Sequence, residues 1–350
     1  MAPWMGISSF ASRRSSNVMG RWLVGVFALG LGACSPAEPV AGSRSAILGG
    51  TEAPEDRGVV AVVNFAGGDC SGALIAPQLV LTARHCVAET DGNERAVVCG
   101  ETPFEPPKSP GAIFVVPLPS ISEDPDDYLP VSAIRMPPGL GDDLCGSDVV
   151  LLVLEKPLEA VTPLAPRLEP APASGEAFSA VGYGQDEALD DAPSGVRKRL
   201  DDLEVVCAGD ACADVDVRSN EWIGTLGACP GDSGGPALDA AGQVIGVVSR
   251  GLGGCSSIIY GDVASRADWL KAEAIAVANA AHRAPPAWAP CDETNPCSAP
   301  PSDDVESTCT IGVPTLPASR AWPWFIACLG WCLRHRATRK FLSGRRARAS

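Results

Sequence analysis

The feature that most constrains the fold is a series of short β-branched runs, separated by Gly, Pro and Asp, between residues 47 and 270. Such runs with almost no helical periodicity are typical of an all-β sandwich or barrel. Alanine-rich residues 264–281 predict one closing helix, and residues 100–145, rich in proline and acids, predict long surface loops. The expected strands are 59–65, 73–75, 80–82, 97–99, 113–116, 149–154, 177–182, 203–206, 244–249 and 258–260.

The N-terminal residues predict export. Three arginines within residues 13–21 precede an apolar run at 22–33, which indicates a signal peptide over 1–33. The run ends in Leu-Gly-Ala-Cys34, which resembles the lipobox of bacterial lipoproteins, where the cysteine becomes the lipidated first residue. An ordinary signal peptide with a chance cysteine is the alternative. We expect an exported protein of the cell envelope, the cell surface or the extracellular space.

The C-terminal residues differ in composition from the rest. Residues 282–320 are rich in Pro, Ser and Asp and predict a linker. Residues 321–333 are mostly apolar and precede a basic tail, but a membrane-spanning helix takes about 20 residues. The 321–350 segment loosely resembles the sorting tails of some bacterial surface proteins, and an interfacial or disordered tail is an equal alternative. Membrane attachment through Cys34 or this tail is therefore a hypothesis.

Charge and cysteine content exclude some functions. The chain has 42 acidic and 27 basic residues, and a net charge of −15 repels the phosphates of nucleic acids. Fourteen cysteines in an exported chain indicate disulfides. A zinc site is disfavoured, because only three histidines exist and the close cysteine pairs lack two-residue spacing. We expect no metal or cofactor. The pairing of six cysteines stays open: Cys99, Cys145, Cys207, Cys212, Cys291 and Cys297.

Three short motifs supply residues suited to acyl transfer. Leu-Thr-Ala-Arg-His-Cys contains His85, Ser-Asp-Val-Val-Leu-Leu contains Asp148, and Gly-Asp-Ser-Gly-Gly-Pro contains Ser233. A hydroxyl is a poor nucleophile at neutral pH, so Ser233 needs a base, and that base needs a carboxylate to fix its tautomer. His85 is the one histidine in the first 280 residues. The motifs therefore predict a serine endopeptidase.

Together, these motifs resemble the chymotrypsin/trypsin-like family of serine peptidases over roughly residues 47–278. The resemblance implies a two-barrel Greek-key fold with a C-terminal helix, a peptidase domain over 47–281, a monomer, and protein or peptide substrates. It makes His85 the general base, Asp148 its orienting carboxylate and Ser233 the nucleophile. Backbone N–H groups of Gly231 and Ser233 would form the oxyanion hole. The implied disulfides are Cys70–Cys86 and Cys229–Cys255.

The resemblance also places a specificity pocket. Its floor lies six residues before the serine, at Gly227, and its walls include Gly251 and Ile258, beside Ser249, which hydrogen-bonds the buried Asp in the family. No carboxylate is available to pair with a substrate Lys or Arg, and an unpaired buried cation loses hydration without compensation. We expect cleavage after small or medium apolar residues such as Ala, Val or Leu.

An activation site is implied as well. Ile47-Leu-Gly-Gly resembles the mature N-terminus of the family, whose new α-amino group pairs with the Asp beside the catalytic Ser, here Asp232. Residues 34–46 would then be a propeptide, and the uncut chain a zymogen. The residue before Ile47 is Ala46, which suits the predicted pocket, so self-cleavage is one route of activation.

Two other functions are compatible with part of the sequence. Gly-Asp-Ser-Gly-Gly also fits the nucleophile elbow of α/β-hydrolases, but that fold needs a later histidine, and only His282 and His335 follow the serine. The second rival is a catalytically impaired homologue that acts as a protein-binding module. It stays open because Arg84 replaces a small residue that normally packs beside the histidine.

Overall fold

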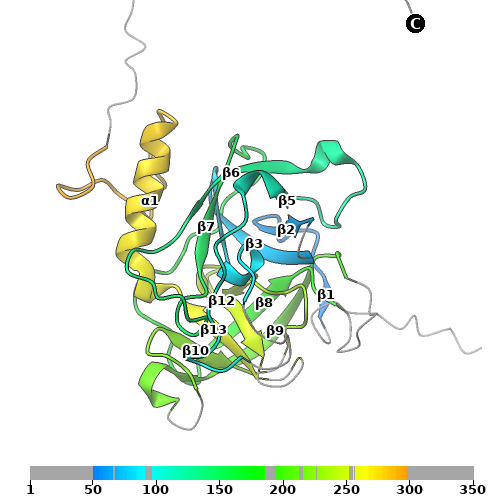
Figure 1. The fold of residues 1–350 in the computed structure, drawn as a ribbon, viewed down its shortest axis with the longest axis vertical. Helices are drawn as coiled ribbons and strands as arrows, with labels where there is room; N and C mark the ends of the chain where they lie inside the picture. Colours follow the sequence, from blue (N-terminus) through cyan, green and yellow to red (C-terminus); the bar gives the residue numbers. More distant parts are fainter. Residues whose placement is uncertain are drawn as a thin grey trace, which may run out of the picture.

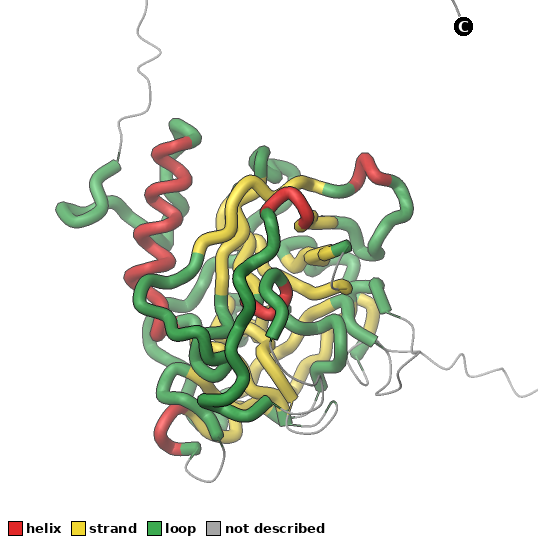
Figure 2. The backbone as a smooth tube through the Cα atoms, viewed as in Figure 1, coloured by secondary structure: helices red, strands yellow, loops and turns green. Residues whose placement is uncertain are grey.

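The computed structural model describes residues 50–65, 68–90, 97–185, 194–212, 216–225, 227–251, 255 and 257–297. Two β-barrels pack against each other, and one long helix, α1, lies along their side (Figure 1). Figure 2 shows the strands, in yellow, in the middle of the body, with loops around and between them. The predicted all-β fold with a C-terminal helix is confirmed. The predictions for Cys34, the propeptide, Ile47 and 321–350 concern segments outside the described residues.

The first barrel is closed by six antiparallel strands in the order β2-β3-β4-β7-β6-β5. Two 3₁₀ helices, Pro110–Ala112 and Pro125–Asp127, lie in its loops, and a third, η1 (Arg84–Cys86), follows β4. The strands are β2 (Val59–Asn64), β3 (Gly68–Ala76), β4 (Leu79–Thr82), β5 (Ile113–Val116), β6 (Leu129–Arg135) and β7 (Val150–Leu154).

The second barrel joins six strands in the order β9-β10-β13-β12-β11-β8, and β8 pairs with β9 to close it. A short strand, β1 (Thr51–Glu52), pairs with the first residues of β9. The 3₁₀ helices Gly209–Ala211 and Ala264–Arg266 follow β9 and β13. The strands are β8 (Ala177–Gly182), β9 (Lys198–Ala208), β10 (Glu221–Gly224), β11 (Pro236–Leu238), β12 (Val244–Gly251) and β13 (Ile258–Asp262).

The hydrophobic core continues across the seam between the barrels. All six residues of β2 are buried, since a strand between a barrel interior and a second barrel has no exposed face. The same apolar cluster contains Val62 of β2 together with Val181 and Leu238 of the second barrel. The apolar run at 59–63 therefore reflects burial on two sides, and the hydrophobic core is continuous between the two barrels at this point.

Helix α1 (Ala267–Ala280) packs on the first barrel through Leu270, Ala274, Ile275 and Ala278, which share one face at helical spacing. The chain then turns back onto the same barrel. The indole N–H of Trp288 donates to the Ile75 carbonyl at 3.0 Å. Residues 283–297, which fall in the predicted linker, thus include a contact with the first barrel.

Several local predictions differ from the structure, since the expected strands do not include β1, β6, β10 and β11. Residues 97–99 form no strand: they lie in a loop where the Thr102 hydroxyl bonds the Val98 backbone. Conversely, β6 lies inside the 100–145 stretch that predicts loops. Pro130 breaks its alternation of apolar and polar residues, which ends at Arg135. The local sequence of β6 therefore did not predict a strand.

Candidate active site

The predicted catalytic residues lie along the seam between the two barrels. His85 is in η1, directly after β4, and Asp148 comes shortly before β7, so the first barrel supplies both. Ser233 precedes β11 of the second barrel. The position of Ser233 relative to His85 and Asp148 therefore depends on contacts across the seam.

His85 and Asp148 form a tight pair. The Nδ1 atom of His85 lies 2.8 Å from Oδ2 of Asp148, and the backbone N–H of His85 donates to Oδ1 at 2.8 Å. The Ser249 hydroxyl donates to Oδ2 at 2.6 Å. The Asp148 side chain is fully buried, whereas about a quarter of the His85 side chain (24%) is exposed. Asp148 thus fixes the ring orientation while the other edge stays accessible.

Burial and charge act in opposite directions on this pair. Burial favours neutral His85, but the charge of Asp148 and its hydrogen bond outweigh this effect and raise the pKa of His85 above 6.5. Burial likewise opposes ionised Asp148, but His85, the Ser249 hydroxyl and a backbone N–H together lower its pKa below 3.8. Asp148 is therefore an anion at neutral pH, and it stabilises an imidazolium on His85.

Ser233 is held at the same seam through its main chain. The backbone N–H of Ser71, in β3, donates to the Ser233 carbonyl at 2.7 Å. The next residue, Gly234, has a φ of +80°, and a Cβ there would lie 2.1 Å from the Thr82 hydroxyl oxygen. Only glycine fits at this position, so the motif brings the serine loop directly against the strand that leads to His85.

The loop before Ser233 presents two backbone donors. The N–H groups of Asp232, Gly234 and Gly235 bond to carbonyls. Those of Gly231 and Ser233 meet no acceptor among the described residues. Ser71 also fixes this loop, since its hydroxyl donates to the Gly231 carbonyl at 2.9 Å.

Asp232 is a buried carboxylate beneath this loop. It accepts the backbone N–H groups of Gly184 and Cys229, each at 2.8 Å. Burial raises its pKa to about 7, although both N–H groups and the charge of Lys198 oppose the rise. Such a carboxylate is stabilised by a cation that reaches it.

A pocket of about 250 Å³ opens beside Ser233. Three of the predicted pocket residues, Ser249, Gly251 and Ile258, line it; Gly227 precedes the lining residue Ala228 but is not itself part of the wall. Among the described lining residues none carries a carboxylate. The sequence analysis did not single out one wall residue, Arg250.

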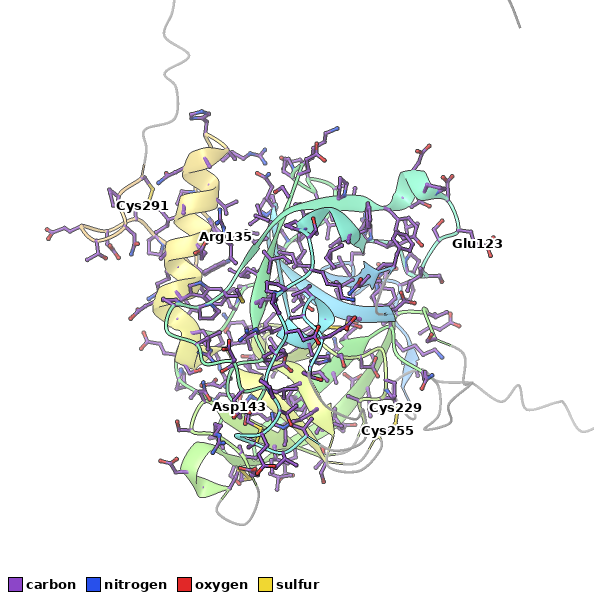
Figure 3. The ribbon with its side chains drawn as sticks, viewed as in Figure 1. Glu123, Arg135, Asp143, Cys229, Cys255 and Cys291 are labelled. Carbon is purple, nitrogen blue, oxygen red and sulfur yellow. A yellow bond between two sulfur atoms is a disulfide. The ribbon has the colours of Figure 1, made fainter. Side chains whose placement is uncertain are left out.

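Disulfides brace the site. Cys70–Cys86 joins β3 to η1, and Cys229–Cys255 ties the serine loop to the segment before β13; the latter pair is labelled in Figure 3. Three further disulfides settle the open pairings: Cys99–Cys145, Cys207–Cys212 and Cys291–Cys297. Cys70 and Cys86 approach His85 closely, but as a disulfide they offer no thiolate to a metal ion.

Arg84 is turned away from the histidine. Its guanidinium lies over the Phe104 ring, 4.2 Å from the ring centroid, and donates to the Gly141 carbonyl at 2.9 Å. Arg84 is only 5% exposed, and its guanidinium forms an ion pair with Asp142 at 3.5 Å. The bulky cation is thus accommodated without separating His85 from Asp148.

Comparison with known proteins agrees with this geometry. The family model described as "Trypsin" matches residues 47–270, which is most of the described chain. The chain belongs to the trypsin family. Its two barrels are the chymotrypsin-like fold of that family, and the protein is a serine protease.

Several curated trypsin-family proteins are similar over the same part of the chain. The thrombin-like enzyme acutin of Deinagkistrodon acutus is 28% identical, over 64% of this chain and 94% of acutin. Granzyme M of Rattus norvegicus is 30% identical, over 63% of this chain and 84% of the granzyme. A solved structure of a mutant human heparin binding protein has a TM-score of 0.47 and 22% identity, over 64% of this chain and 94% of that one. Within the described residues, no helix has the length and apolar character needed to cross a membrane.

Proposed function

We propose that this protease is an exported endopeptidase that hydrolyses peptide bonds through an acyl-enzyme on Ser233. The observation that carries the proposal is the buried carboxylate of Asp148, which holds both the ring and the backbone N–H of His85. This arrangement fixes the tautomer in which Nδ1 carries the proton, so that Nε2 is free to act as a base. It occurs in a chain whose serine lies in Gly-Asp-Ser-Gly-Gly-Pro.

In the proposed reaction, Ser233 Oγ attacks the carbonyl carbon of the scissile bond while its proton passes to Nε2 of His85. The carbonyl oxygen becomes an oxyanion, which the N–H groups of Gly231 and Ser233 stabilise. The C–N bond then breaks, and His85 returns the proton to the leaving amine. Water repeats the sequence on the acyl-enzyme and releases the second product and Ser233.

The state of His85 sets the pH dependence of the reaction. Because only neutral His85 accepts the serine proton and its pKa is raised, activity falls as pH drops through a midpoint above 6.5. We expect kcat/KM measured between pH 5 and pH 9 to show an acid limb in that position. Asp148→Asn removes the charge that raises the pKa and should move the limb to lower pH. A wild-type midpoint below 6.5 would contradict the proposed His85–Asp148 coupling.

The pocket predicts substrate preference. Ala228 and Ile258 narrow its apolar interior, and the described wall offers no anion to a basic side chain. We expect cleavage after Ala, Val or Leu, and a kcat/KM for Arg substrates lower by roughly 100-fold or more. Digestion of a mixed peptide library, with the cut sites mapped by mass spectrometry, measures this preference and shows endopeptidase activity directly. Preferred cleavage after Arg or Lys would overturn this specificity.

The structure also supports activation at Ile47. Strand β1 pairs with β9, placing Glu52 beside Lys198, which in turn pairs with Gly182 close to the Asp232 site. Arg197, only 1% exposed, donates to the carbonyls of Ala53 and Pro54 and fixes this segment. Residues 47–50 span at most about 13 Å. A new amino group at Ile47 would therefore stay within a short distance of the fixed segment at Ala53 and Pro54.

Five disulfides support export to an oxidising compartment, and several of the similar proteins are snake venom serine proteases. We propose that Cys34 carries the lipid of an exported precursor and that cleavage after Ala46 releases the enzyme from it. Attachment through 321–350 would then be the remaining link to the envelope. The mature enzyme is proposed to be a monomer without cofactor.

A further inference from the structure

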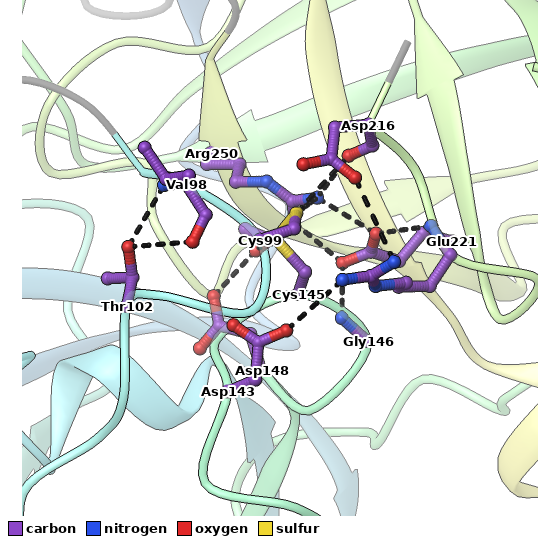
Figure 4. Close-up of a disulfide and its surroundings, with 12 residues drawn as sticks. Val98, Cys99, Thr102, Asp143, Cys145, Gly146, Asp148, Asp216, Glu221 and Arg250 are labelled. Atoms are coloured by element: carbon purple, nitrogen blue, oxygen red, sulfur yellow. Dashed lines mark hydrogen bonds and ion pairs between the residues drawn. A yellow bond between two sulfur atoms is a disulfide. The ribbon is translucent and has the colours of Figure 1, made fainter.

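A buried ion pair lies next to the proposed site (Figure 4). Arg250 of β12 donates from both guanidinium nitrogens to Glu221 at the start of β10, at 2.6 and 2.9 Å. The side chains are only 8% and 1% exposed. A buried pair of this kind gains little net stability, because removing both charges from water is costly. Its position therefore needs a further explanation.

Glu221 also holds the chain just before Asp148. Its Oε1 atom accepts the backbone N–H of Gly146 at 2.7 Å. The Gly146 carbonyl accepts the side-chain amide of Asn220 at 2.8 Å, and Arg266 also donates to it. Gly146 has a φ of +78°, and a Cβ there would lie 2.8 Å from the Asn220 amide oxygen. Side chains of the second barrel thus bond both the N–H and the carbonyl of Gly146, two residues before Asp148.

The Glu221–Arg250 pair also reaches Asp148 from a second direction, through Arg250 and Ser249. One guanidinium nitrogen lies 3.4 Å from the Ser249 hydroxyl, which donates to Asp148. The other donates to the Asp216 carbonyl and lies 3.8 Å from the sulfur of Cys99, in the Cys99–Cys145 disulfide. Arg250 lines the pocket, and these contacts hold its side chain in place. Its charge is paired with that of Glu221.

We propose that Glu221 is a positioning residue for Asp148, acting through Gly146 on one side and through Arg250 and Ser249 on the other. The inference rests on the proposed function, in which Asp148 orients His85. The charged groups that act on Glu221 are Arg250 and Arg266. The Oε2 atom of Glu221 also accepts the backbone N–H of Arg218 at 2.9 Å. Removing the carboxylate charge loosens the loop that carries Asp148, although the disulfide at Cys145 remains intact.

The test is Glu221→Gln, which keeps the volume but replaces one acceptor oxygen with an NH₂ group that faces Arg250. We expect kcat to fall by roughly 10- to 100-fold, with KM changed less than about threefold. The His85 titration midpoint should also fall, by roughly half a pH unit or more, because Asp148 is what raises it. NMR of the imidazole signals measures that midpoint, and only three histidines need assignment.

The chain offers a matched control in Glu176, which forms a two-point ion pair with Arg167 and accepts the backbone N–H of Ala173. Glu176→Gln removes the same chemistry from the same barrel, away from Asp148. Because the Glu176 side chain is 25% exposed, we expect a smaller loss of thermal stability than in Glu221→Gln, with kcat and the His85 midpoint unchanged. A shift of the His85 midpoint equal in both variants would overturn the inference, because it would reflect general loosening.

A second variant guards against misfolding. Glu221→Leu combined with Arg250→Met replaces the pair by apolar side chains of similar volume, an exchange that buried pairs often tolerate. If this folded variant shows wild-type kcat and His85 midpoint, Glu221 is structural only and the inference fails; a lowered midpoint supports it. Titrations in a Ser233→Ala background do not depend on turnover. They test Glu221 even if the wild-type protein cleaves no peptide, a result that would refute the proposed function alone.

Discussion

Ser233→Ala should lower peptide hydrolysis by roughly 10,000-fold or more while the fold stays intact. The alanine lacks the oxygen that forms the acyl-enzyme, and the remaining His85–Asp148 pair has no nucleophile to activate. The loss should appear in kcat, because the pocket and its wall are unchanged. Steady-state kinetics measures this loss of kcat on a peptide that has Ala or Val immediately before the cleaved bond.

Ser132 provides the control for removing a hydroxyl. It lies on the exposed side of β6 and donates to the Val153 carbonyl at 3.0 Å, away from the seam. Ser132→Ala should leave kcat/KM within about twofold of wild type. If Ser233→Ala keeps wild-type turnover, the assignment of the nucleophile is wrong.

Cleavage before Ile47 should raise activity by roughly 100-fold or more, because it orders the loop that carries the oxyanion donors Gly231 and Ser233. The new ammonium group would pair with Asp232, whose buried carboxylate already accepts two backbone N–H groups. The measurement uses a chain in which residues 42–46 are replaced by the recognition sequence of an added protease. The kcat/KM is then compared before and after the cut.

Stability gives an independent reading of the same event. The pKa of Asp232 is raised to about 7 in the uncut fold, above its ordinary value of 3.8, so the folded chain binds more protons than the unfolded chain between these values. The uncut chain should therefore lose stability as pH rises from about 4 to 7. The cut chain, with an ammonium group at Asp232, should lose less. Equal activity and equal pH dependence in the two forms would contradict the activation model.

Self-activation is a separate question within that model. If the protease cuts its own Ala46–Ile47 bond, the Ser233→Ala protein should retain residues before Ile47, while the wild type begins at Ile47. N-terminal sequencing of both proteins decides between self-cleavage and a second protease. Ile47 ends on the Ser233→Ala protein would exclude self-activation and leave the role of Asp232 standing.

The sequence predicted the architecture where local pattern and tertiary burial agree. The valine-rich run that became β2 is buried on both sides, and the alanine-rich stretch became α1. It failed where neighbours decide the structure. Val97 and Val98 are β-branched but lie in a loop that leads into the Cys99–Cys145 disulfide, and β6 pairs with β7 although its own composition favours loops. These outcomes depend on strand partners that local composition does not specify.

The same division holds in the site. Specific motifs marked His85, Asp148 and Ser233 in the sequence, because each combines a reactive residue with neighbours of unusual type. Glu221 and Arg250 lie 29 positions apart with no motif around them, and Ser71 is one serine among many. Their roles come from barrel packing, which brings β3, β10 and β12 to one seam. Sequence pattern alone carries no signal for such contacts.

The most direct test of the central claim is labelling of the folded, activated protein with a fluorophosphonate probe, followed by peptide mapping. The account predicts one equivalent of label, on Ser233, with peptide hydrolysis lost in proportion to labelling and no label on the Ser233→Ala protein. Peptide hydrolysis that persists in fully labelled protein, or a label on another residue, would contradict it.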